Sequence, residues 1–529
     1  MLPVPPSSPA RRARRTKRAA VLVAVHDARY KAPPVPFDNS YKRLPARFFA
    51  EVAPRRSKAP VLRALNEPLA EILGAEEAFG LEPGWLRGPR GVEILAGSVV
   101  PEGAASIAIA YAGHQFGRFV PQLGDGRAIL LGELVGRDGA RRDLVWKGSG
   151  RTPFSRNGDG RAALGPVLRE YVVSEAMAAL GIPTTRALSA VTTGEPVMRD
   201  TALPGAVLVR VAASHLRVGT FEYFAARKDE EALALLVRHA LERHYPDAAG
   251  TGEDAVALLD RVIAAQAELV ARWLGVGFVH GVMNTDNTSI SGETLDYGPC
   301  AFLDEYDPEK RFSSIDHGGR YAFARQPRIA LWNMARFAET LLPLIAEAQD
   351  EAVARATASL DRFEHHFTTA HARVVRAKLG LLEVQDDDVA LADDLFARLA
   401  ANEVDFTLFF RRLVSAAADA TADQEIAALF DDPGEFRAWA ERWRARLARE
   451  DAASPPAARA DVMRRANPAF IPRNHRIEEL ITAANDGDFG PFEAILRVLA
   501  RPYDDQPESG RWADPPAPEE RVEATFCGT

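Results

Sequence analysis

The sequence predicts an α+β protein with two lobes, a β-rich lobe followed by a larger helical lobe. Two observations predict this class. Glycines and short β-type runs are frequent between residues 97 and 211, whereas helical apolar patterns dominate the chain beyond about residue 228. We therefore expect a β-rich part with a preceding helical segment over 37–227, a helical part over 228–501 and an extended tail over 502–529.

The composition is that of a folded globular protein. The 529 residues are 47% hydrophobic and 26% charged, with a formal net charge of −8. No apolar run reaches the roughly 18 residues that indicate a membrane-spanning helix, and the mild acidity argues against a dedicated nucleic-acid binder. The two cysteines, Cys300 and Cys527, are too few for a structural zinc site or a disulfide framework. They favour a reducing compartment, and abundant Ala and Arg suggest a bacterial gene, so we expect a cytoplasmic protein.

The first 36 residues differ from the rest. Residues 1–26 contain six basic residues and no acidic one, and prolines recur up to Pro36. This composition predicts a disordered basic arm, with order beginning near Phe37. A mitochondrial transit peptide is also basic and poor in acid, but it is usually amphipathic, and the prolines here oppose a helix. A solvated extension is therefore the favoured interpretation.

The β-rich part is expected to begin with a helix. Apolar residues recur at helical spacing over 62–73, and Pro68 should start or kink that helix. The turn at 137–139 separates two β-type runs and predicts a hairpin. The expected elements that follow residue 97 are strands over 128–134, 143–147 and 207–211 and a helix over 166–180.

The helical part is predicted from apolar periodicity alone. The expected helices cover residues 231–244, 253–274, 327–347, 350–379, 389–401, 405–420 and 434–449. Four prolines between 507 and 518 predict an extended conformation for the tail.

Two glycine-rich segments suggest phosphate contact. Gly124 and Gly126 form a Gly-x-Gly turn ahead of an apolar strand, followed by Arg127, and such a turn lets backbone N–H groups approach phosphate. The third glycine of a kinase loop is absent, because Ile129 stands in its place. A plain β-turn remains the alternative. A second loop ends in Asp159 and Gly160 at the entry of the 166–180 helix, where a simple connection is equally compatible.

A strand lysine and a helix glutamate form the second feature. Lys147 ends an apolar strand, and a lysine that pairs with phosphates needs a carboxylate to hold it. The helix over 166–180 offers Glu170 and Glu175. We prefer Glu170, which follows Lys147 by 23 residues. An exposed lysine at the strand end is the alternative.

The third and fourth features resemble the catalytic and metal-binding segments of kinases. His280 and Asn287 match the ends of the H-R-D-x-x-x-x-N loop, but Val282 stands where the catalytic aspartate belongs. A carboxylate reappears at Asp286. Nine residues after Asn287, Asp296-Tyr297-Gly298 resembles D-F-G, whose aspartate binds Mg²⁺. Because all four features occur in kinase order, the sequence predicts a protein-kinase-like bilobal fold.

Three arginines modify this interpretation. Arg127, Arg210 and Arg217 offer permanent positive charge near a nucleotide, and arginine binds phosphate oxygens in a bidentate manner. Surface ion pairing would explain any one of them alone. Together they exceed what a kinase loop uses, which suggests that the β- and γ-phosphates are held as a leaving group.

The chain resembles the selenoprotein O family of protein adenylyltransferases, which are pseudokinases. The resemblance covers nearly everything from Phe37 to the C-terminus. The segments that carry it are Phe37–Tyr41, Tyr111–Gly117, Gln122–Arg127, Lys147–Gly150, His280–Asn287, Asp296–Pro299 and Asn467-Pro468, together with a cysteine near the C-terminus.

The resemblance implies a kinase-like fold that binds ATP in an inverted orientation. AMP then moves to a Ser, Thr or Tyr hydroxyl of a protein, and pyrophosphate leaves. Asp286 should be the catalytic base, Glu170 should pair with Lys147, and Asn287 and Asp296 should bind Mg²⁺, although Mn²⁺ also accepts oxygen ligands. The residues expected at the nucleotide are Gly124, Gly126, Arg127, Lys147, Asp159, Gly160, Arg210, Arg217 and Asp296.

Two competing functions stay open at this point. One is a phosphotransferase that uses the γ-phosphate, which Val282 disfavours. The other is an inactive ATP-binding scaffold, which has no reason to keep Lys147, Asn287 and Asp296.

A regulatory disulfide between Cys300 and Cys527 would pin the tail across the active-site segment. Two unrelated thiols are the alternative.

Overall fold

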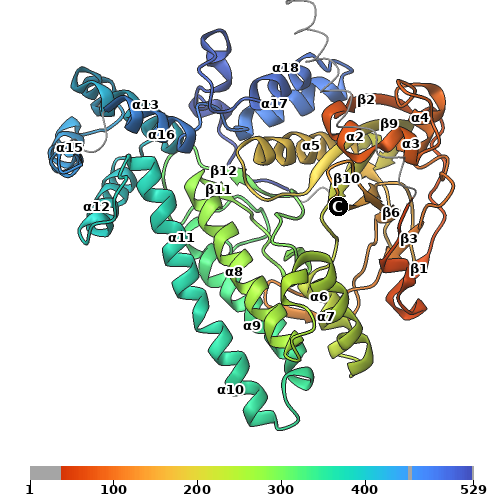
Figure 1. Ribbon diagram of the computed structural model, residues 1–529. Helices are drawn as coiled ribbons and strands as arrows, with labels where there is room; N and C mark the ends of the chain where they lie inside the picture. Colours follow the sequence, from red (N-terminus) through yellow and green to blue (C-terminus); the bar gives the residue numbers. More distant parts are fainter. Residues whose placement is uncertain (1–36, 451–455, 527–529) are drawn as a thin grey trace, which may run out of the picture.

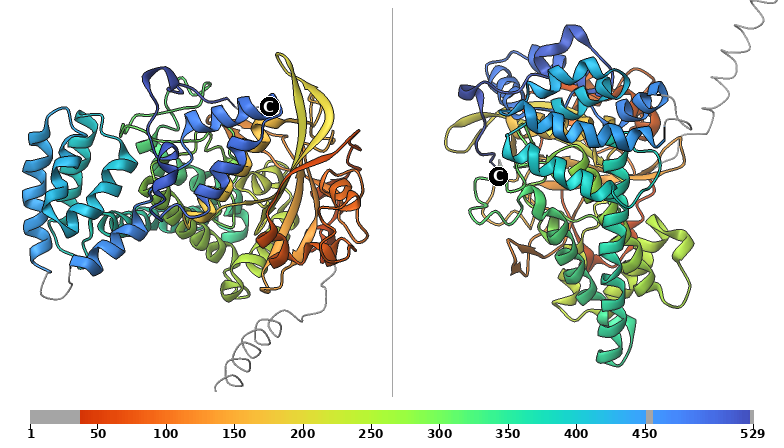
Figure 2. Two further views of the ribbon diagram at one scale, coloured as in Figure 1. Left: turned by 90° about the horizontal axis from the view of Figure 1, so that it is seen from above. Right: turned by 90° about the vertical axis from the view of Figure 1, so that its left-hand side faces the viewer.

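The computed structural model describes residues 37–450 and 456–526 (Figure 1). The predicted basic arm and Cys527 lie outside these residues. An antiparallel sheet with flanking helices lies at one end of the molecule, and the helices α12–α16 lie at the other (Figure 2). The fold is therefore mixed α+β, with a sheet region and many helices, as the sequence predicts.

The large sheet has eight strands among the described residues, all paired antiparallel. The predicted hairpin is confirmed, because β6 and β7 pair directly. In sheet order the strands are β1 (Phe49–Glu51), β3 (Ile107–Ile109), β6 (Ala128–Val135), β7 (Arg141–Lys147), β10 (Ala202–Ala212), β9 (Arg186–Met198) and β2 (Val61–Leu65), and β8 (Ala162–Ala163) pairs with β10.

Successive residues of a strand point to opposite faces of the sheet. In β7 and β10, the apolar core residues and the charged site residues therefore lie on different faces. Trp146 of β7 and Val209 of β10 belong to the core beneath the first three helices, α2 (Glu67–Leu73), α3 (Ala75–Ala78) and α4 (Pro89–Leu95). Lys147 and Arg210 are their neighbours in sequence, so they face the other side of the sheet. On that side lies α5 (Leu164–Ala179), which also covers Leu208.

Helix α5 is enclosed from both sides. Its apolar residues pack against the sheet and against two helices near the C-terminus, α17 (Asn474–Asn485) and α18 (Gly490–Leu499). The last part of the chain thus returns to the sheet, as Figure 1 shows. Gly165 of α5 has no space for a side chain, because Ile481 of α17 fills it.

The helical region has two cores. The first contains α6 (Val218–Ala225), α7 (Glu230–His244), α8 (Asp254–Gly275), α9 (Gln326–Ile345), α10 (Gln349–Leu360) and part of α11 (Arg362–Leu379). The second contains the rest of α11 with α12 (Asp388–Ala401), α13 (Phe406–Ala418), α14 (Asp423–Ala427), α15 (Pro433–Ala448) and α16 (Pro456–Ala466). Two small two-stranded sheets complete the described part of the fold. One is the hairpin of β4 (Gly113–Gln115) and β5 (Arg118–Val120), and the other pairs β11 (Phe278–Val279) with β12 (Ala301–Phe302).

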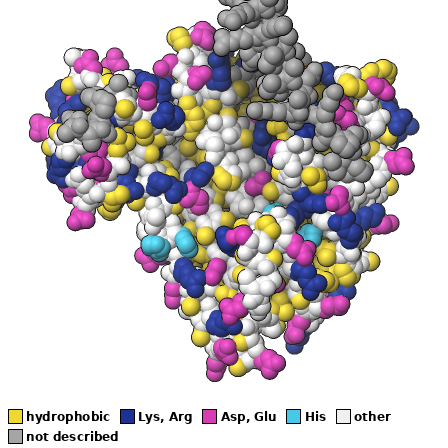
Figure 3. All heavy atoms as spheres, in the orientation of Figure 1, with side chains coloured by type: hydrophobic (Ala, Val, Ile, Leu, Met, Phe, Trp, Pro, Cys, Tyr) yellow, Lys and Arg dark blue, Asp and Glu magenta, His cyan; other side chains and the backbone are white. Residues whose placement is uncertain are grey.

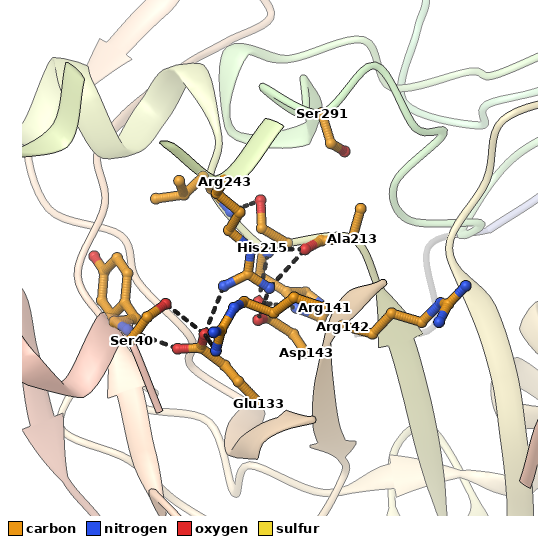
Figure 4. A network of polar contacts seen from close by, with 12 residues as sticks. Ser40, Glu133, Arg141, Arg142, Asp143, Ala213, His215, Arg243 and Ser291 are labelled. Carbon is orange, nitrogen blue, oxygen red and sulfur yellow. Dashed lines mark hydrogen bonds and ion pairs between the residues drawn. The ribbon is translucent and has the colours of Figure 1, made fainter. Parts of the chain in front are cut away.

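A buried polar network connects the sheet to the helical region (Figure 4). Arg243 of α7 binds Glu133 of β6 at 2.8 Å and Asp143 of β7 at 2.5 Å. Its Nε also donates to the Ala213 carbonyl at 2.8 Å, and the His215 N–H donates to Asp143 at 2.8 Å. The network therefore fixes the segment that joins β10 to α6.

Three sequence predictions need correction. Residues 61–65 form β2 rather than the start of a helix, because the Asn66 side chain caps α2 by accepting from the Leu69 N–H, and Pro68 lies in its first turn. The predicted 350–379 helix divides near Asp361 into α10 and α11. The tail is not wholly extended, since 3₁₀ turns form at Pro507–Trp512 and Pro518–Glu520.

The other predicted elements after residue 97 are present, with boundaries shifted by a few residues. Strand β9 and helices α6, α16, α17 and α18 were not anticipated.

Among the described residues, no helix is long and apolar enough to cross a membrane. Acidic and basic side chains are intermixed over the face shown in Figure 3.

Candidate active site

A cleft of about 940 Å³ lies between the sheet and the loop after β11. It brings together nearly all of the residues that the sequence nominated, from segments far apart in the chain. Those that line it are Gly124, Gly126, Arg127, Lys147, Asp159, Gly160, Arg210, Arg217, Asp286, Asn287 and Asp296. Glu170 lies behind Lys147, which it contacts.

Four charged residues form a compact group at the base of the cleft, in which Lys147, Glu170 and Arg210 are buried and Asp296 is half-buried. Lys147 binds Glu170 and donates to Asp296 Oδ1 at 2.6 Å. Arg210 donates to Glu170 Oε1 at 2.7 Å through Nε and to Asp296 Oδ1 at 3.2 Å. Each carboxylate is thus shared by both cations. Glu170 rather than Glu175 contacts the lysine, because Glu175 binds Arg186 instead.

The two carboxylates of this group are held ionised. Burial opposes the charge of Glu170, but Arg210 and Lys147 outweigh burial and lower its pKa. Burial likewise opposes the charge of Asp296, and Lys147, Arg210 and Arg127 together bring its pKa well below the usual range. Asp296 also has a φ of 72°, which is unusual for a residue other than glycine and is typical of constrained functional sites.

The Gly-x-Gly turn packs against the second loop. Gly124 has a φ of 115°, and a side chain there would overlap the ring of Phe154, at 2.4 Å. Thr152 donates to the Asp125 carbonyl at 2.6 Å, which joins the two loops. The absence of a side chain at Gly124 therefore serves loop packing, an interaction that the Gly-x-Gly pattern does not reveal.

The second loop is held by a hairpin tip. Arg199, which follows β9, binds Asp159 at 3.1 Å and also donates to the Arg161 carbonyl at 2.9 Å. Asp159 accepts the Arg161 N–H at 2.9 Å. Arg199 lines the cleft and was not anticipated, because the residue that it supports lies 40 positions away.

The loop after β11 presents Asp286 and Asn287. Asp286 is 7% exposed, and burial raises its pKa to about 6 although Arg217 opposes the rise. Asn287 donates its amide to the Val282 carbonyl at 3.0 Å, which leaves the amide oxygen as its available ligand atom. Val282 itself lines the cleft and offers no group that accepts a proton.

Arg217 joins the two sides of the cleft. Its Nη1 donates to the Asp286 carbonyl at 2.9 Å, and its Nη2 lies 3.5 Å from Asp125. The guanidinium also stacks over the Tyr111 ring, 4.4 Å from its centre. Arg217 is thus held at the cleft wall by three contacts.

A comparison with known families identifies the family of the chain. The family described as "Protein adenylyltransferase SelO" matches residues 34–500. The chain belongs to the SelO family. The family match therefore extends over all the residues that line the cleft.

Close relatives of this SelO chain are bacterial. A "Protein nucleotidyltransferase YdiU" of Bradyrhizobium sp. (strain ORS 278) is 62% identical over 495 residues, which cover 93% of this chain and 99% of the relative. Proteins of the same name in Rhodopseudomonas palustris and Methylorubrum extorquens are 61% and 62% identical, with the same shares covered.

One cysteine of the predicted disulfide, Cys300, lies among the described residues. Cys300 is a fully buried free thiol, and burial raises its pKa to about 12. The tail reaches this region, because the Thr525 hydroxyl donates to the Pro299 carbonyl at 2.6 Å. Cys527 lies outside the described residues, so the disulfide stays a prediction.

Gln115 is a further cleft residue for which the sequence predicted no role. Gln115 of β4 donates to Asp286 Oδ2 at 3.1 Å, across 171 positions of sequence. It lies inside the Tyr111–Gly117 segment that carries the family resemblance, but no chemical role followed from that segment alone.

Proposed function

We propose that this SelO-family adenylyltransferase transfers AMP from ATP to Ser, Thr or Tyr hydroxyls of proteins and releases pyrophosphate. The observation that carries the proposal is the concentration of fixed positive charge in the cleft beside a loop that lacks the kinase aspartate. Lys147 and Arg210 share the carboxylates of Glu170 and Asp296, and Arg217 is held separately by Asp286 and Asp125. Arg127 lines the same cleft. Such charge stabilises pyrophosphate as it leaves.

In this proposal the β- and γ-phosphates of ATP lie against Lys147, Arg210 and Arg217. The α-phosphate then faces the acceptor protein. A bond forms between the acceptor oxygen and the α-phosphorus, and the bond from that phosphorus to the β-bridging oxygen breaks. The acceptor proton passes to the Asp286 carboxylate, which is the acid group that the loop offers in place of Val282.

The residues present fit a divalent cation. Asn287 keeps its amide oxygen available because its amide N–H₂ is bound to Val282, and Asp296 is held ionised. These are the oxygen ligands that Mg²⁺ and Mn²⁺ prefer. A bound cation would neutralise phosphate charge, while Lys147 and Arg210 keep Asp296 in place. Magnesium rather than manganese is our expectation.

We also infer that the sheet region and the helical region act as the two lobes of a kinase-like fold. The cleft lies between them, Lys147 of the strand pairs with Glu170 of α5, and Asp296 of the D-Y-G segment binds Lys147. The lobes correspond to residues 37–227 and 228–501, except that α6 packs in the helical region and that α17 and α18 pack on α5. Residues 502–529 form the tail.

Product analysis tests this function. We would incubate the enzyme with ATP, Mg²⁺ and a protein mixture, and measure both pyrophosphate release and the mass added to each acceptor. Equal amounts of AMP adduct and pyrophosphate are expected, and both should vanish in Asp296→Ala. A phosphoryl adduct would instead support the γ-phosphate transferase. ATP binding without any adduct would support the scaffold.

A further inference from the structure

The β4–β5 hairpin is docked on the loop that carries the proposed base. Three consecutive residues of the hairpin each bind a residue of the loop. The His114 N–H donates to Thr285 Oγ1 at 2.7 Å, Gln115 donates to Asp286 Oδ2 at 3.1 Å, and the Phe116 N–H donates to Asn284 Oδ1 at 3.0 Å. The hairpin therefore holds each of the loop residues from 284 to 286 through its side chain.

The hairpin also fits tightly over Asp286. A side chain at Gly113 would lie 2.7 Å from Asp286 Oδ1, so only glycine permits this approach. Asp286 Oδ1 is buried and has no hydrogen-bond partner among residues 37–450 and 456–526. Within that part of the chain, Gln115 is therefore the one side chain that donates to this carboxylate.

The β4–β5 hairpin is anchored to helix α6 and to the loop through Glu222. Glu222 of α6 accepts from the Thr285 hydroxyl at 2.5 Å and lies 2.5 Å from His114 Nδ1. The side chain of Glu222 is 4% exposed, so it ties β4, α6 and the loop together from inside the protein. Gln115 thus extends from a backbone that has little freedom to move.

We propose that Gln115 is a positioning residue that fixes the Asp286 carboxylate for proton transfer from the acceptor hydroxyl. The inference rests on the proposed function, in which Asp286 is the base. The physical need arises because the carboxylate stands four residues beyond Val282, in the turn at Thr285–Asn287. In that position it has no side-chain donor from its own loop, and the hairpin supplies one.

The test uses Gln115→Met, which keeps the length of the side chain and removes its hydrogen bond. We expect kcat for AMP transfer to fall about ten- to hundredfold, the range typical of lost supporting contacts. The dissociation constant of ATP should change less than about twofold. Gln115→Asn, whose amide is drawn back from Asp286, should lose a similar factor. Arg118→Met is the matched control, because the exposed Arg118 pairs with Gln115 across the hairpin.

A double-mutant cycle separates positioning from a general structural role. If Gln115 acts through Asp286, Gln115→Met should cause no further loss in the Asp286→Asn background. Unchanged kcat in both Gln115 variants, or fully additive losses, would overturn the inference while the proposed function stands. A fully active Asp286→Asn would overturn the base assignment and the inference with it. A wild-type enzyme that transfers no AMP would overturn the function itself.

Discussion

Glu170 lies between two buried cations, and this placement has a measurable consequence. Glu170 and Arg210 are 5% and 4% exposed. In Glu170→Gln, Arg210 and Lys147 lose one of the two carboxylates that they share, and removing one member of a buried charge group costs about 3–5 kcal/mol. We expect the free energy of unfolding to fall by about that amount and AMP transfer to be lost. Urea unfolding and a transfer assay check both.

The control lies on the same helix. Glu175 binds Arg186, whose side chain is 35% exposed. Glu175→Gln should therefore cost less stability than Glu170→Gln and leave kcat unchanged. Equal effects of the two substitutions on AMP transfer would contradict the role of Glu170.

Lys378 predicts a pH dependence of stability away from the site. It is 2% exposed, its Nζ lies 4.1 Å from the centre of the Phe410 ring, and no carboxylate in the described chain forms an ion pair with it. Burial lowers its pKa from 10.5 to about 7. Between these values the unfolded chain binds the extra proton, so stability should rise with pH, by at most about 1.4 kcal/mol per unit.

Unfolding experiments at pH 7.5 and pH 9 check this sign. Lys378→Met should be more stable than wild type at pH 7.5. Its advantage should shrink at pH 9, because the proton that the unfolded wild-type amine must release on folding costs less free energy as the pH approaches 10.5. A constant difference between the two proteins would show that Lys378 does not titrate in this range.

At the scale of elements, the position of the C-terminal tail bears on the predicted disulfide between Cys300 and Cys527. Thr525 is joined by backbone hydrogen bonds to residues 312 and 314 and by its hydroxyl to Pro299, the neighbour of Cys300. Mild oxidation should therefore change the mobility of the protein in a non-reducing gel, and Cys527→Ser should abolish the change. Because burial raises the pKa of Cys300 to about 12, the reaction should be slow.

No change in mobility, together with unaltered activity in Cys527→Ser, would refute a disulfide between Cys300 and Cys527. In that case the tail contact at Pro299 is a packing interaction.

The elements that could be predicted from the sequence are those whose apolar residues recur with one clear period, either helical or β-type. The hairpin β6–β7 and most helices before residue 450 are examples. Strand β9 was missed because most of its residues up to Thr193 are buried, so polar and apolar residues do not alternate. The pairing of Lys147 with Glu170 followed from kinase spacing. The contact from Gln115 to Asp286 could not be predicted, since only the folded chain brings these residues together.

At the scale of the whole molecule, the network around Arg243 couples the sheet to the nucleotide cleft. Arg243→Met would leave Glu133 and Asp143 buried without their shared cation, at a cost of about 3–5 kcal/mol. It should also weaken ATP binding, because the segment that leads to Arg217 loses its anchor at Ala213. Calorimetric ATP titration and urea unfolding measure the two effects.

Arg142→Ala is the control for this prediction. Arg142 is close in sequence to the network but binds Asp138 on the surface and lies apart from Arg243 in Figure 4. Such exposed pairs contribute about 1 kcal/mol or less. If Arg142→Ala weakened ATP binding as much as Arg243→Met, the coupling would not depend on the network.

AMP, and not the γ-phosphate, is the group that the proposed reaction transfers. The most direct measurement compares ATP labelled at the α-phosphate with ATP labelled at the γ-phosphate, using Mg²⁺, a mixed protein substrate and Asp296→Ala as control. We predict protein labelling from the α position alone, lost in the variant. Labelling from the γ position alone would contradict this prediction and would mean that the arginines of the cleft hold phosphate for an ordinary kinase reaction.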